Sequence, residues 1–173
     1  MTEPRQLKAQ VRPMNSDDLE QVLGWRNNVD IRRYMHTQHE ISLDEHLRWF
    51  ERCRLDKRKH LLIFEADKQA LGFVNFNELA SGAIAEWGFY VAPDAPKGSG
   101  RELGVTALNH AFNNLKLHKI CGQTLAFNER SIRLFQSFGF QQEGTFRDQH
   151  FDGERYHDVF CFGLLSHEWQ PKL

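Results

Sequence analysis

The sequence predicts a single α/β (α+β) domain in which helices cover a twisted, mainly antiparallel mixed sheet. A chain of 173 residues suits one domain with a substantial core. Apolar residues recur at helical spacing in four segments, and short apolar runs bounded by turn residues separate them. These segments give the order strand, two helices, three strands, helix, strand, helix and two strands, over one domain spanning residues 1–173.

The first third predicts one strand and two helices. Residues 6–14 form the strand, and residues 15–28 form a helix with Ser16 as N-cap. Acidic residues in the first turn suit the helix dipole, and the later apolar positions have helical spacing: Asp17, Asp18, Leu19, Val22, Leu23 and Arg26. The second helix begins near Ser42 with Glu45 completing a capping box, and its apolar face is Leu43, Leu47, Phe50 and Leu55.

The remaining segments alternate strands with helices. Residues 60–66 and 70–79 form a hairpin, and the strand in 83–93 ends at Pro93. The helix in 102–117 has an apolar stripe at positions 103, 107, 108, 111, 112 and 115. A strand follows in 119–128, then a helix ended by Gly139 and a hairpin over 146–165 that turns at Asp152-Gly153.

Composition excludes several classes of partner. The formal net charge is −1, with 22 basic and 23 acidic residues, so no overall field attracts nucleic acid or an anionic membrane. The cysteines Cys53, Cys121 and Cys161 are odd in number and widely spaced, which argues against a disulfide framework or zinc knuckle. No apolar segment resembles a signal peptide or a membrane span. We expect a cytoplasmic protein, and a homodimer is compatible with these features.

The stretch APKGSGRELG, residues 95–104, has the position of a phosphate site between a strand and a helix. Helix-start amides and the helix dipole favour anions, glycine admits close approach, and Lys97 and Arg101 add charge. A P-loop requires GxxxxGK[ST] and a dinucleotide fold requires GxGxxG, and neither pattern is present. The alternative is a flexible turn that only precedes a helix.

Two motifs in order resemble the GNAT (Gcn5-related) N-acetyltransferases. Residues 97–102, KGSGRE, loosely match R/Q-x-x-G-x-G/A, with Lys97 and Glu102 as departures. The stretch FNERSIRLFQSFGFQQEG matches the later strand end, helix and GF. The resemblance spans the chain and implies splayed fourth and fifth strands that hold acetyl-CoA. It implies these cofactor-binding residues: Val91, Lys97, Gly98, Ser99, Gly100, Arg101, Asn128, Ser131 and Phe135. For Asn128, a helix N-cap is the structural alternative.

The acceptor side resembles a narrower group, the N-acetyltransferases of pseudaminic acid biosynthesis. The stretches LGWRNNVDIRRYM, ISLDEHLRWF and EWGFYVAP carry this likeness. It implies acetylation of the 4-amino group of UDP-4-amino-4,6-dideoxy-N-acetyl-β-L-altrosamine, whose product serves flagellin glycosylation. The implied acceptor-binding residues are Arg26, Met35, His46, Trp49 and Tyr90. Each has a structural alternative: Trp49 in the core, His46 solvated on its helix, and Arg26 extending along the surface.

Direct transfer needs a neutral amine, a polarised carbonyl and a proton for the leaving thiolate. Glu86 is the candidate base, with a cross-strand charge pair as its alternative role. A backbone N–H near Tyr90 or Val91 can polarise the carbonyl. Many GNAT enzymes carry a tyrosine acid where this chain has Phe135, which has no proton to give. Either water, Ser137 or Tyr90 supplies the proton, or the thiolate leaves and is protonated later.

Other functions remain open from the sequence. The pairs His36 and His39, or His150 and His157, invite a metal site, but no metal-binding motif contains them. A protein N-terminus or a polyamine are alternative acceptors, and a non-catalytic acyl-CoA-binding domain is another alternative. Basic residues in the first two helical segments favour an anionic acceptor over a polyamine: Arg26, Arg32, Arg33 and Arg48.

Overall fold

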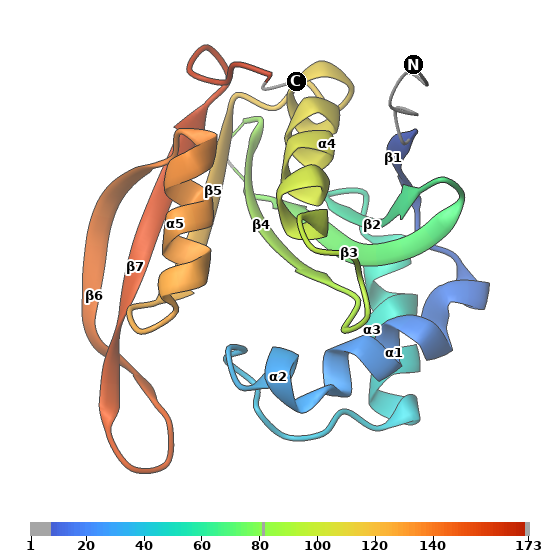
Figure 1. Cartoon of the computed structure of the whole chain (residues 1–173), viewed down its shortest axis with the longest axis horizontal. Helices are drawn as coiled ribbons and strands as arrows, with labels where there is room; N and C mark the ends of the chain where they lie inside the picture. Colours follow the sequence, from blue (N-terminus) through green and yellow to red (C-terminus); the bar gives the residue numbers. More distant parts are fainter. Residues whose placement is uncertain (1–7, 81, 172–173) are drawn as a thin grey trace, which may run out of the picture.

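A computed structural model describes residues 8–80 and 82–171 (Figure 1). A 3₁₀ turn, η1, covers Ser16–Asp18. The helices are α1 Leu19–Asn27, α2 Val29–Arg32, α3 Leu43–Leu55, α4 Ser99–Asn113 and α5 Glu129–Phe138. The strands are β1 Ala9–Pro13, β2 Lys59–Ala66, β3 Gln69–Glu78, β4 Ile84–Val91, β5 Lys119–Leu125, β6 Gln141–Phe151 and β7 Tyr156–Leu165.

All seven strands form one mixed sheet in the order β1-β2-β3-β4-β5-β7-β6. Every neighbouring pair is antiparallel except β4 and β5, which are parallel. That pair is short, because only Ile84–Glu86 of β4 align with Lys119–Cys121 of β5. Beyond these residues the two strands diverge, which Figure 1 shows as a gap that widens below the top of the molecule. The predicted mixed sheet with splayed fourth and fifth strands is confirmed.

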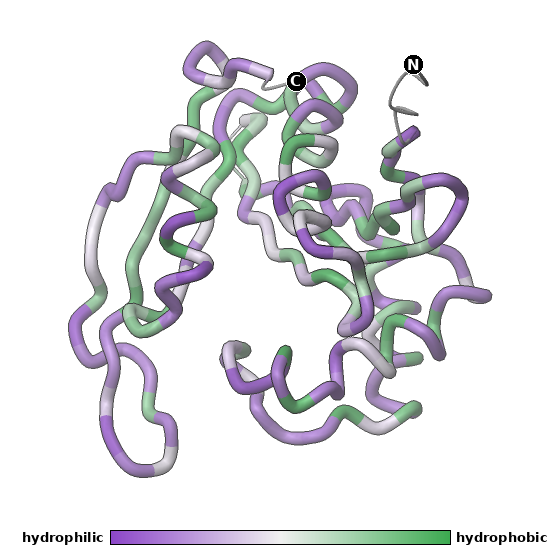
Figure 2. The backbone as a smooth tube through the Cα atoms, viewed as in Figure 1, coloured by the Kyte–Doolittle hydropathy of each residue, from purple (hydrophilic) through white to green (hydrophobic). Residues whose placement is uncertain are grey.

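Strand alternation divides the core between the two faces of the sheet. On β2, Leu62 and Phe64 pack in the larger cluster with α4 and α5, whereas Ile63 packs in a second cluster with α1 and α3. The same alternation on β4 turns Trp87 toward the first cluster and Tyr90 toward the second. Figure 2 shows green, apolar backbone through β7 and the central strands, and a more polar outer strand β6. Helices therefore cover both faces, and residues of β4 reach both layers.

The helices α4 and α5 approach closely because Gly104 has no side chain. A Cβ built at Gly104 would lie 2.1 Å from Cζ of Phe138 on α5. Gly139 then ends α5 in the left-handed conformation, with φ of 91°, as the sequence predicted. The predicted turn at Asp152-Gly153 is also present, with the Asp152 carboxylate accepting from the amides of Glu154 and Arg155.

Two local predictions in the first third were wrong. Asn15, rather than Ser16, caps the first turn, because its extended backbone lets its side chain accept from the Asp17 amide while Asp18 accepts from the Asn15 amide. The buried face of α3 is His46, Phe50 and Cys53, of which Phe50 was predicted. The predicted leucines of that helix face outward, and the exposed fractions of Leu43, Leu47 and Leu55 are 47%, 38% and 76%.

Several boundaries also differ from prediction. The four-residue helix α2 was not predicted, and α4 begins at Ser99, so that its first turn includes part of the glycine-rich stretch. Leu115 lies beyond the end of α4. Strand β6 begins at Gln141 rather than at 146. Residues 6 and 7 of the first predicted strand lie outside the described residues. Ser42 is the N-cap of α3 and forms the predicted capping box.

Candidate active site

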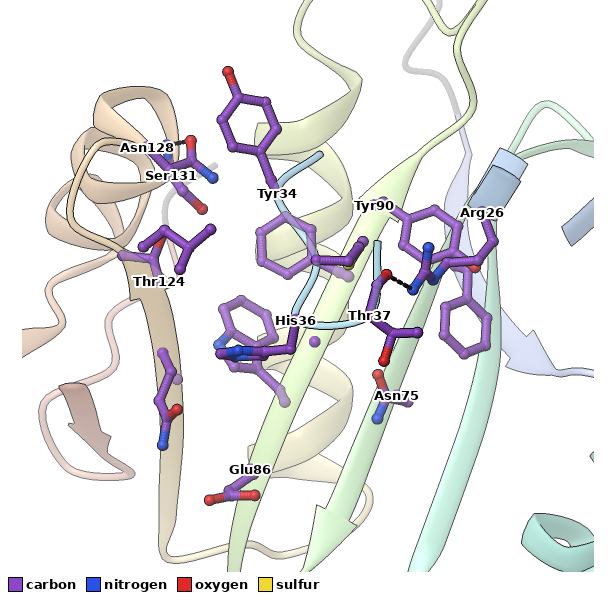
Figure 3. Close-up of a pocket in the computed structure, with 18 of the residues that line it drawn as sticks. Arg26, Tyr34, His36, Thr37, Asn75, Glu86, Tyr90, Thr124, Asn128 and Ser131 are labelled. Carbon is purple, nitrogen blue, oxygen red and sulfur yellow. Dashed lines mark hydrogen bonds between the residues drawn. The ribbon is translucent and has the colours of Figure 1, made fainter. Parts of the chain in front are cut away.

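A cavity of about 1170 Å³ opens where β4 and β5 separate (Figure 3). On the α1–α3 face of the sheet, its wall includes Glu86 and Tyr90 of β4. On the opposite face, its wall includes Trp87 of β4 and Phe135 of α5. The cavity therefore passes through the sheet, and a molecule on each face can reach the same point. The segment between α2 and α3 lines the α1–α3 side with Tyr34, Met35, His36, Thr37, His39 and Ile41.

Buried polar atoms without partners concentrate in this cavity. Among the described residues, three side chains have such an atom: Nη1 of Arg26, Nε2 of His46 and Nε1 of Trp87. All three residues line the cavity. A buried polar group without a hydrogen bond is costly, by about 1–3 kcal/mol, and native structures hold few of them. A polar ligand bound in the cavity would supply partners for such atoms.

Arg26 and Tyr90 lie together on the α1–α3 side, as Figure 3 shows. Nη2 of Arg26 donates to the carbonyl of Thr37 at 2.8 Å. Burial lowers the pKa of Arg26, with the charge of Arg32 acting in the same direction. Burial raises the pKa of the Tyr90 hydroxyl well above its usual range, against the opposing charge of Arg26. The guanidinium is thus partly desolvated, and an anion that reached Nη1 would restore its lost interactions.

His46 and Trp49 form the adjoining wall, as the sequence placed them. Their rings stack with centroids 5.1 Å apart, and His46 is 5% exposed. Burial lowers the pKa of His46, although a hydrogen bond with the backbone of Leu19 opposes this. The Trp49 ring also packs edge-on against Phe73 in the second core cluster. Trp49 therefore has both its structural role and a place in the cavity wall, and Met35 lines the same side.

Glu86 lies at the point where β4 and β5 begin to diverge. It is the last β4 residue aligned with β5, opposite Cys121. Its side chain lines the cavity and makes no ion pair or hydrogen bond with the described residues. Among the described residues, Glu86 therefore forms no cross-strand charge pair, which was its alternative role. Figure 3 shows the carboxylate between the two strands.

The position of the usual tyrosine acid is filled by a buried aromatic cluster. Phe135 is 5% exposed and stacks on Phe162, with their centroids 5.0 Å apart. Its ring also lies near the backbone of Gly122, where an added Cβ would be 2.6 Å from Cε1 of Phe135. Ser137 Oγ donates to the carbonyl of Leu134, and Ser137 is not among the cavity residues. Of the two hydroxyls considered from the sequence, the one in the cavity wall is that of Tyr90.

The glycine-rich turn lies outside this cavity, at the start of α4. Gly98 has φ of 95° and precedes the first residue of the helix. Both donors of Ser99, its amide and its hydroxyl, bind the Pro96 carbonyl, and the Arg101 amide binds the Gly98 carbonyl. The amides of Gly98 and Gly100 donate to no described residue. These two amides, with the exposed side chains of Lys97 and Arg101, are the anion-binding groups that the turn offers.

The free edge of β4 connects this turn to the cavity. Gly100 lies beside Val91, since an added Cβ would be 3.9 Å from Cγ1 of Val91. The Ala92 amide donates to Leu71 of β3, so by antiparallel alternation the amides of Val91 and Phe89 face the gap instead. The backbone N–H groups of Tyr90 and Val91 were the two donors considered for the thioester carbonyl. Of these, the Val91 amide points toward the gap.

Asn128 and Ser131 border the cavity from the β5–α5 side. The Asn128 side chain accepts from the Ser131 amide at 3.2 Å, so Asn128 is an N-cap, as the structural alternative held. The cap leaves Asn128 in the cavity wall, and its binding of the cofactor stays a prediction.

The histidine pairs considered from the sequence have other partners. His36 contacts the ring of His150, His39 contacts Glu45, and His157 contacts Asp152. Within residues 8–80 and 82–171, no group of three or more metal-ligating side chains could hold an ion. In the same residues, no helix has the length and apolar character needed to cross a membrane.

Comparison with known proteins decides the family. The model of the acetyltransferase (GNAT) domain matches residues 9–141. The acetyltransferase PseH of Campylobacter jejuni is 31% identical over 145 residues, which cover 83% of this chain and 86% of PseH. This chain belongs to the GNAT family.

The GNAT assignment makes the chain an acetyl-CoA-dependent N-acetyltransferase rather than a non-catalytic acyl-CoA-binding domain. The spermidine N-acetyltransferase of Vibrio cholerae is also similar, with 29% identity over 92% of this chain and 94% of that enzyme. Its crystal structure with CoA and spermine matches with a TM-score of 0.86 and 27% identity, covering 93% and 97% of the two chains. This chain therefore shares the GNAT fold and the cofactor with its relatives. PseH and the spermidine N-acetyltransferase have different names, so the comparisons leave the acceptor open.

Sequence reasoning missed several residues of the wall of this GNAT cavity. Asn75, Trp87, Gln123, Thr124 and Arg52 line it but were not predicted as site residues. Strand alternation could have placed Asn75 near Glu86, because a polar residue in an apolar strand faces solvent or a site. Trp87 had no such indication, since a tryptophan in an apolar strand normally belongs to the core.

Proposed function

We propose that this enzyme acetylates the 4-amino group of a UDP-linked 4-amino-4,6-dideoxy sugar, UDP-4-amino-4,6-dideoxy-N-acetyl-β-L-altrosamine. The reaction would belong to pseudaminic acid biosynthesis for flagellin glycosylation and take place in the cytoplasm. The similarity to PseH and the wall residues Arg26, Met35, His46, Trp49 and Tyr90 support this acceptor.

The charges of the cavity carry the proposal. Arg26, Arg48 and Arg52 line it and form no ion pair among the described residues. Two of its three carboxylates are already engaged, since Glu45 caps α3 and Glu143 binds Lys119 at 2.8 Å. The cavity therefore offers unpaired guanidinium groups for a diphosphate and one free carboxylate, Glu86, for an amine.

Acetyl-CoA would enter from the α4–α5 face. Its diphosphate would bind the amides of Gly98 and Gly100 together with Lys97 and Arg101, and its pantetheine amides would pair with the free edge of β4 near Val91. Asn128, Ser131 and Phe135 would border the chain of the cofactor. The thioester would then reach the divergence of β4 and β5, beside Glu86.

Transfer would be direct, within a ternary complex. The sugar amine loses its proton to Glu86, directly or through water, and attacks the thioester carbonyl carbon, so that a C–N bond forms and the C–S bond breaks. The Val91 amide would stabilise the developing oxyanion. Since Phe135 has no proton to give, the CoA thiolate would take its proton from water or from Tyr90.

Thiol release tests the acceptor. The protein is mixed with acetyl-CoA and either the UDP-linked amino sugar or spermidine, and free CoA thiol is followed over time. We expect rapid release with the sugar nucleotide and little with spermidine, because the unpaired arginines attract a diphosphate and repel a polycation. Release with spermidine or a peptide, but not with the sugar, would refute the proposed acceptor.

A further inference from the structure

The segment from Arg33 to Ile41, here called the acceptor loop, supplies much of the cavity wall without regular structure of its own. It follows α2 and precedes α3, and its cavity-lining residues are Tyr34, Met35, His36, Thr37, His39 and Ile41. A wall built from such a segment needs external hydrogen bonds to hold one conformation.

Asn27 supplies two of these bonds from the last residue of α1. Its Nδ2 donates to the carbonyl of Ile41 at 2.8 Å, and its Oδ1 accepts from the amide of Ile41 at 2.8 Å. One side-chain amide thus pairs with both backbone groups of a single residue and closes a loop across 14 positions. The neighbouring Arg26 adds the bond to Thr37 in the middle of the loop.

The helix that carries Asn27 is fixed in the core. Val22 and Trp25 of α1 are 0% and 7% exposed and pack with Ile63 and Phe73 of the sheet. The position of Asn27 is therefore set by the sheet itself. The side-chain amide of Asn27 binds Ile41, so it ties the end of the acceptor loop to α1.

The other side of the loop has lighter contacts with the β5–β7 half of the molecule. Tyr34 faces Phe127 with ring centroids 6.1 Å apart, and His36 faces His150 at 5.8 Å. Gln38 Nε2 lies 3.2 Å from Nε2 of His150. These are ring contacts and one side-chain pair, and no backbone bond joins the described loop residues to β5, β6 or β7.

We propose that Asn27 is a positioning residue for the acceptor: its amide holds the acceptor loop in place and thereby sets the shape of the acceptor wall. The inference rests on the proposed role of this wall in binding the acceptor amine. It does not depend on which amine that is. The cofactor contacts proposed at Gly98, Gly100 and Val91 lie on other elements, so the effect should be specific to the acceptor.

The test compares Asn27→Ala and Asn27→Asp with the wild type. Asn27→Asp keeps an acceptor for the Ile41 amide but loses the donor to its carbonyl. We expect both variants to raise KM for the acceptor about tenfold or more, with KM for acetyl-CoA unchanged. Amide hydrogen exchange of residues 33–41 should become faster in both, while exchange in β2–β4 stays as in the wild type.

Asn28→Ala is the matched control, because the Asn28 side chain caps α2 by accepting from the Asp30 amide at 2.9 Å and makes no other hydrogen bond with the described residues. It should leave both Michaelis constants and the exchange of the acceptor loop close to wild type. Wild-type loop exchange and acceptor KM in Asn27→Ala and Asn27→Asp would overturn the proposal, as would an equal effect of Asn28→Ala.

The assay uses whichever amine the wild-type protein acetylates. If that amine is spermidine, the proposed function fails. The role of Asn27 is still tested, because its variants should raise KM for spermidine and leave KM for acetyl-CoA unchanged. The exchange measurement needs no acceptor at all, so the two failures are distinguishable.

Discussion

At the scale of single residues, three buried polar atoms have no partner among the described residues. Nη1 of Arg26, Nε2 of His46 and Nε1 of Trp87 come from α1, α3 and β4, and all three residues line one cavity. Arg26 and His46 were predicted as site residues from a family resemblance, and Trp87 was not. The difference has a physical reason: burial without a partner depends on contacts between distant segments, which residue type and spacing do not reveal.

In the proposed mechanism, Glu86 accepts the proton of the amine. Glu86→Gln keeps the size of the side chain and removes the base, so we expect kcat to fall by about 100-fold or more. Both Michaelis constants should stay near wild type, because the amide still fills the same space. Steady-state kinetics with each substrate varied in turn measures this.

Glu78→Gln is the matched control for that variant. Glu78 ends β3, and its carboxylate contacts His60 at 2.9 Å outside the cavity. A comparable loss of kcat in Glu78→Gln, or wild-type kcat in Glu86→Gln, would remove Glu86 from the proton path.

At the scale of helices and strands, the sequence predicted the ends of helices well. It predicted less well which face of a helix is buried. The capping box of Ser42 with Glu45, the cap at Asn128 and the stop at Gly139 depend on neighbours within a few residues, and all three are present. The buried face of α3 depends on what the helix meets. His46 is buried there because its ring bonds the Leu19 backbone and stacks on Trp49, which apolar periodicity cannot detect.

The divergence of β4 and β5 was predicted from family resemblance rather than from strand patterns. Both strands look like ordinary apolar strands, and the three-residue parallel pairing is a long-range property. Gly122 on β5 leaves room for two aromatic rings that lie against this strand. A Cβ there would come within 2.7 Å of Cζ of Phe135 and 2.9 Å of Nε1 of Trp87.

The contact of α4 with α5 provides a prediction at this scale. In Gly104→Ala the new methyl group would overlap the Phe138 ring, so we expect a loss of about 1–3 kcal/mol in the free energy of unfolding. Gly24→Ala in α1 is the opposite case, because nothing lies within 4 Å of its added Cβ. That variant should gain about 0.5–1 kcal/mol. Urea unfolding of both proteins measures the difference, and equal effects would contradict the close packing.

At the scale of the whole molecule, the sheet separates two hydrophobic cores. The cavity connects the two faces of the sheet. In the proposed mechanism, the cofactor and the acceptor approach from opposite sides of the sheet and meet at Glu86. The fold is shared with spermidine acetyltransferases, so the fold alone does not choose the acceptor. Arg26, Arg48 and Arg52 line the cavity and have no carboxylate partner among the described residues, and this supports the proposed anionic acceptor.

A crystal structure with CoA and the UDP-linked amino sugar tests this arrangement most directly. We predict the CoA diphosphate at the amides of Gly98 and Gly100, the UDP diphosphate at the arginines of the cavity, and the 4-amino group beside Glu86. A sugar nucleotide bound outside the cavity, or an amine directed away from Glu86 with the arginines unoccupied, would contradict it.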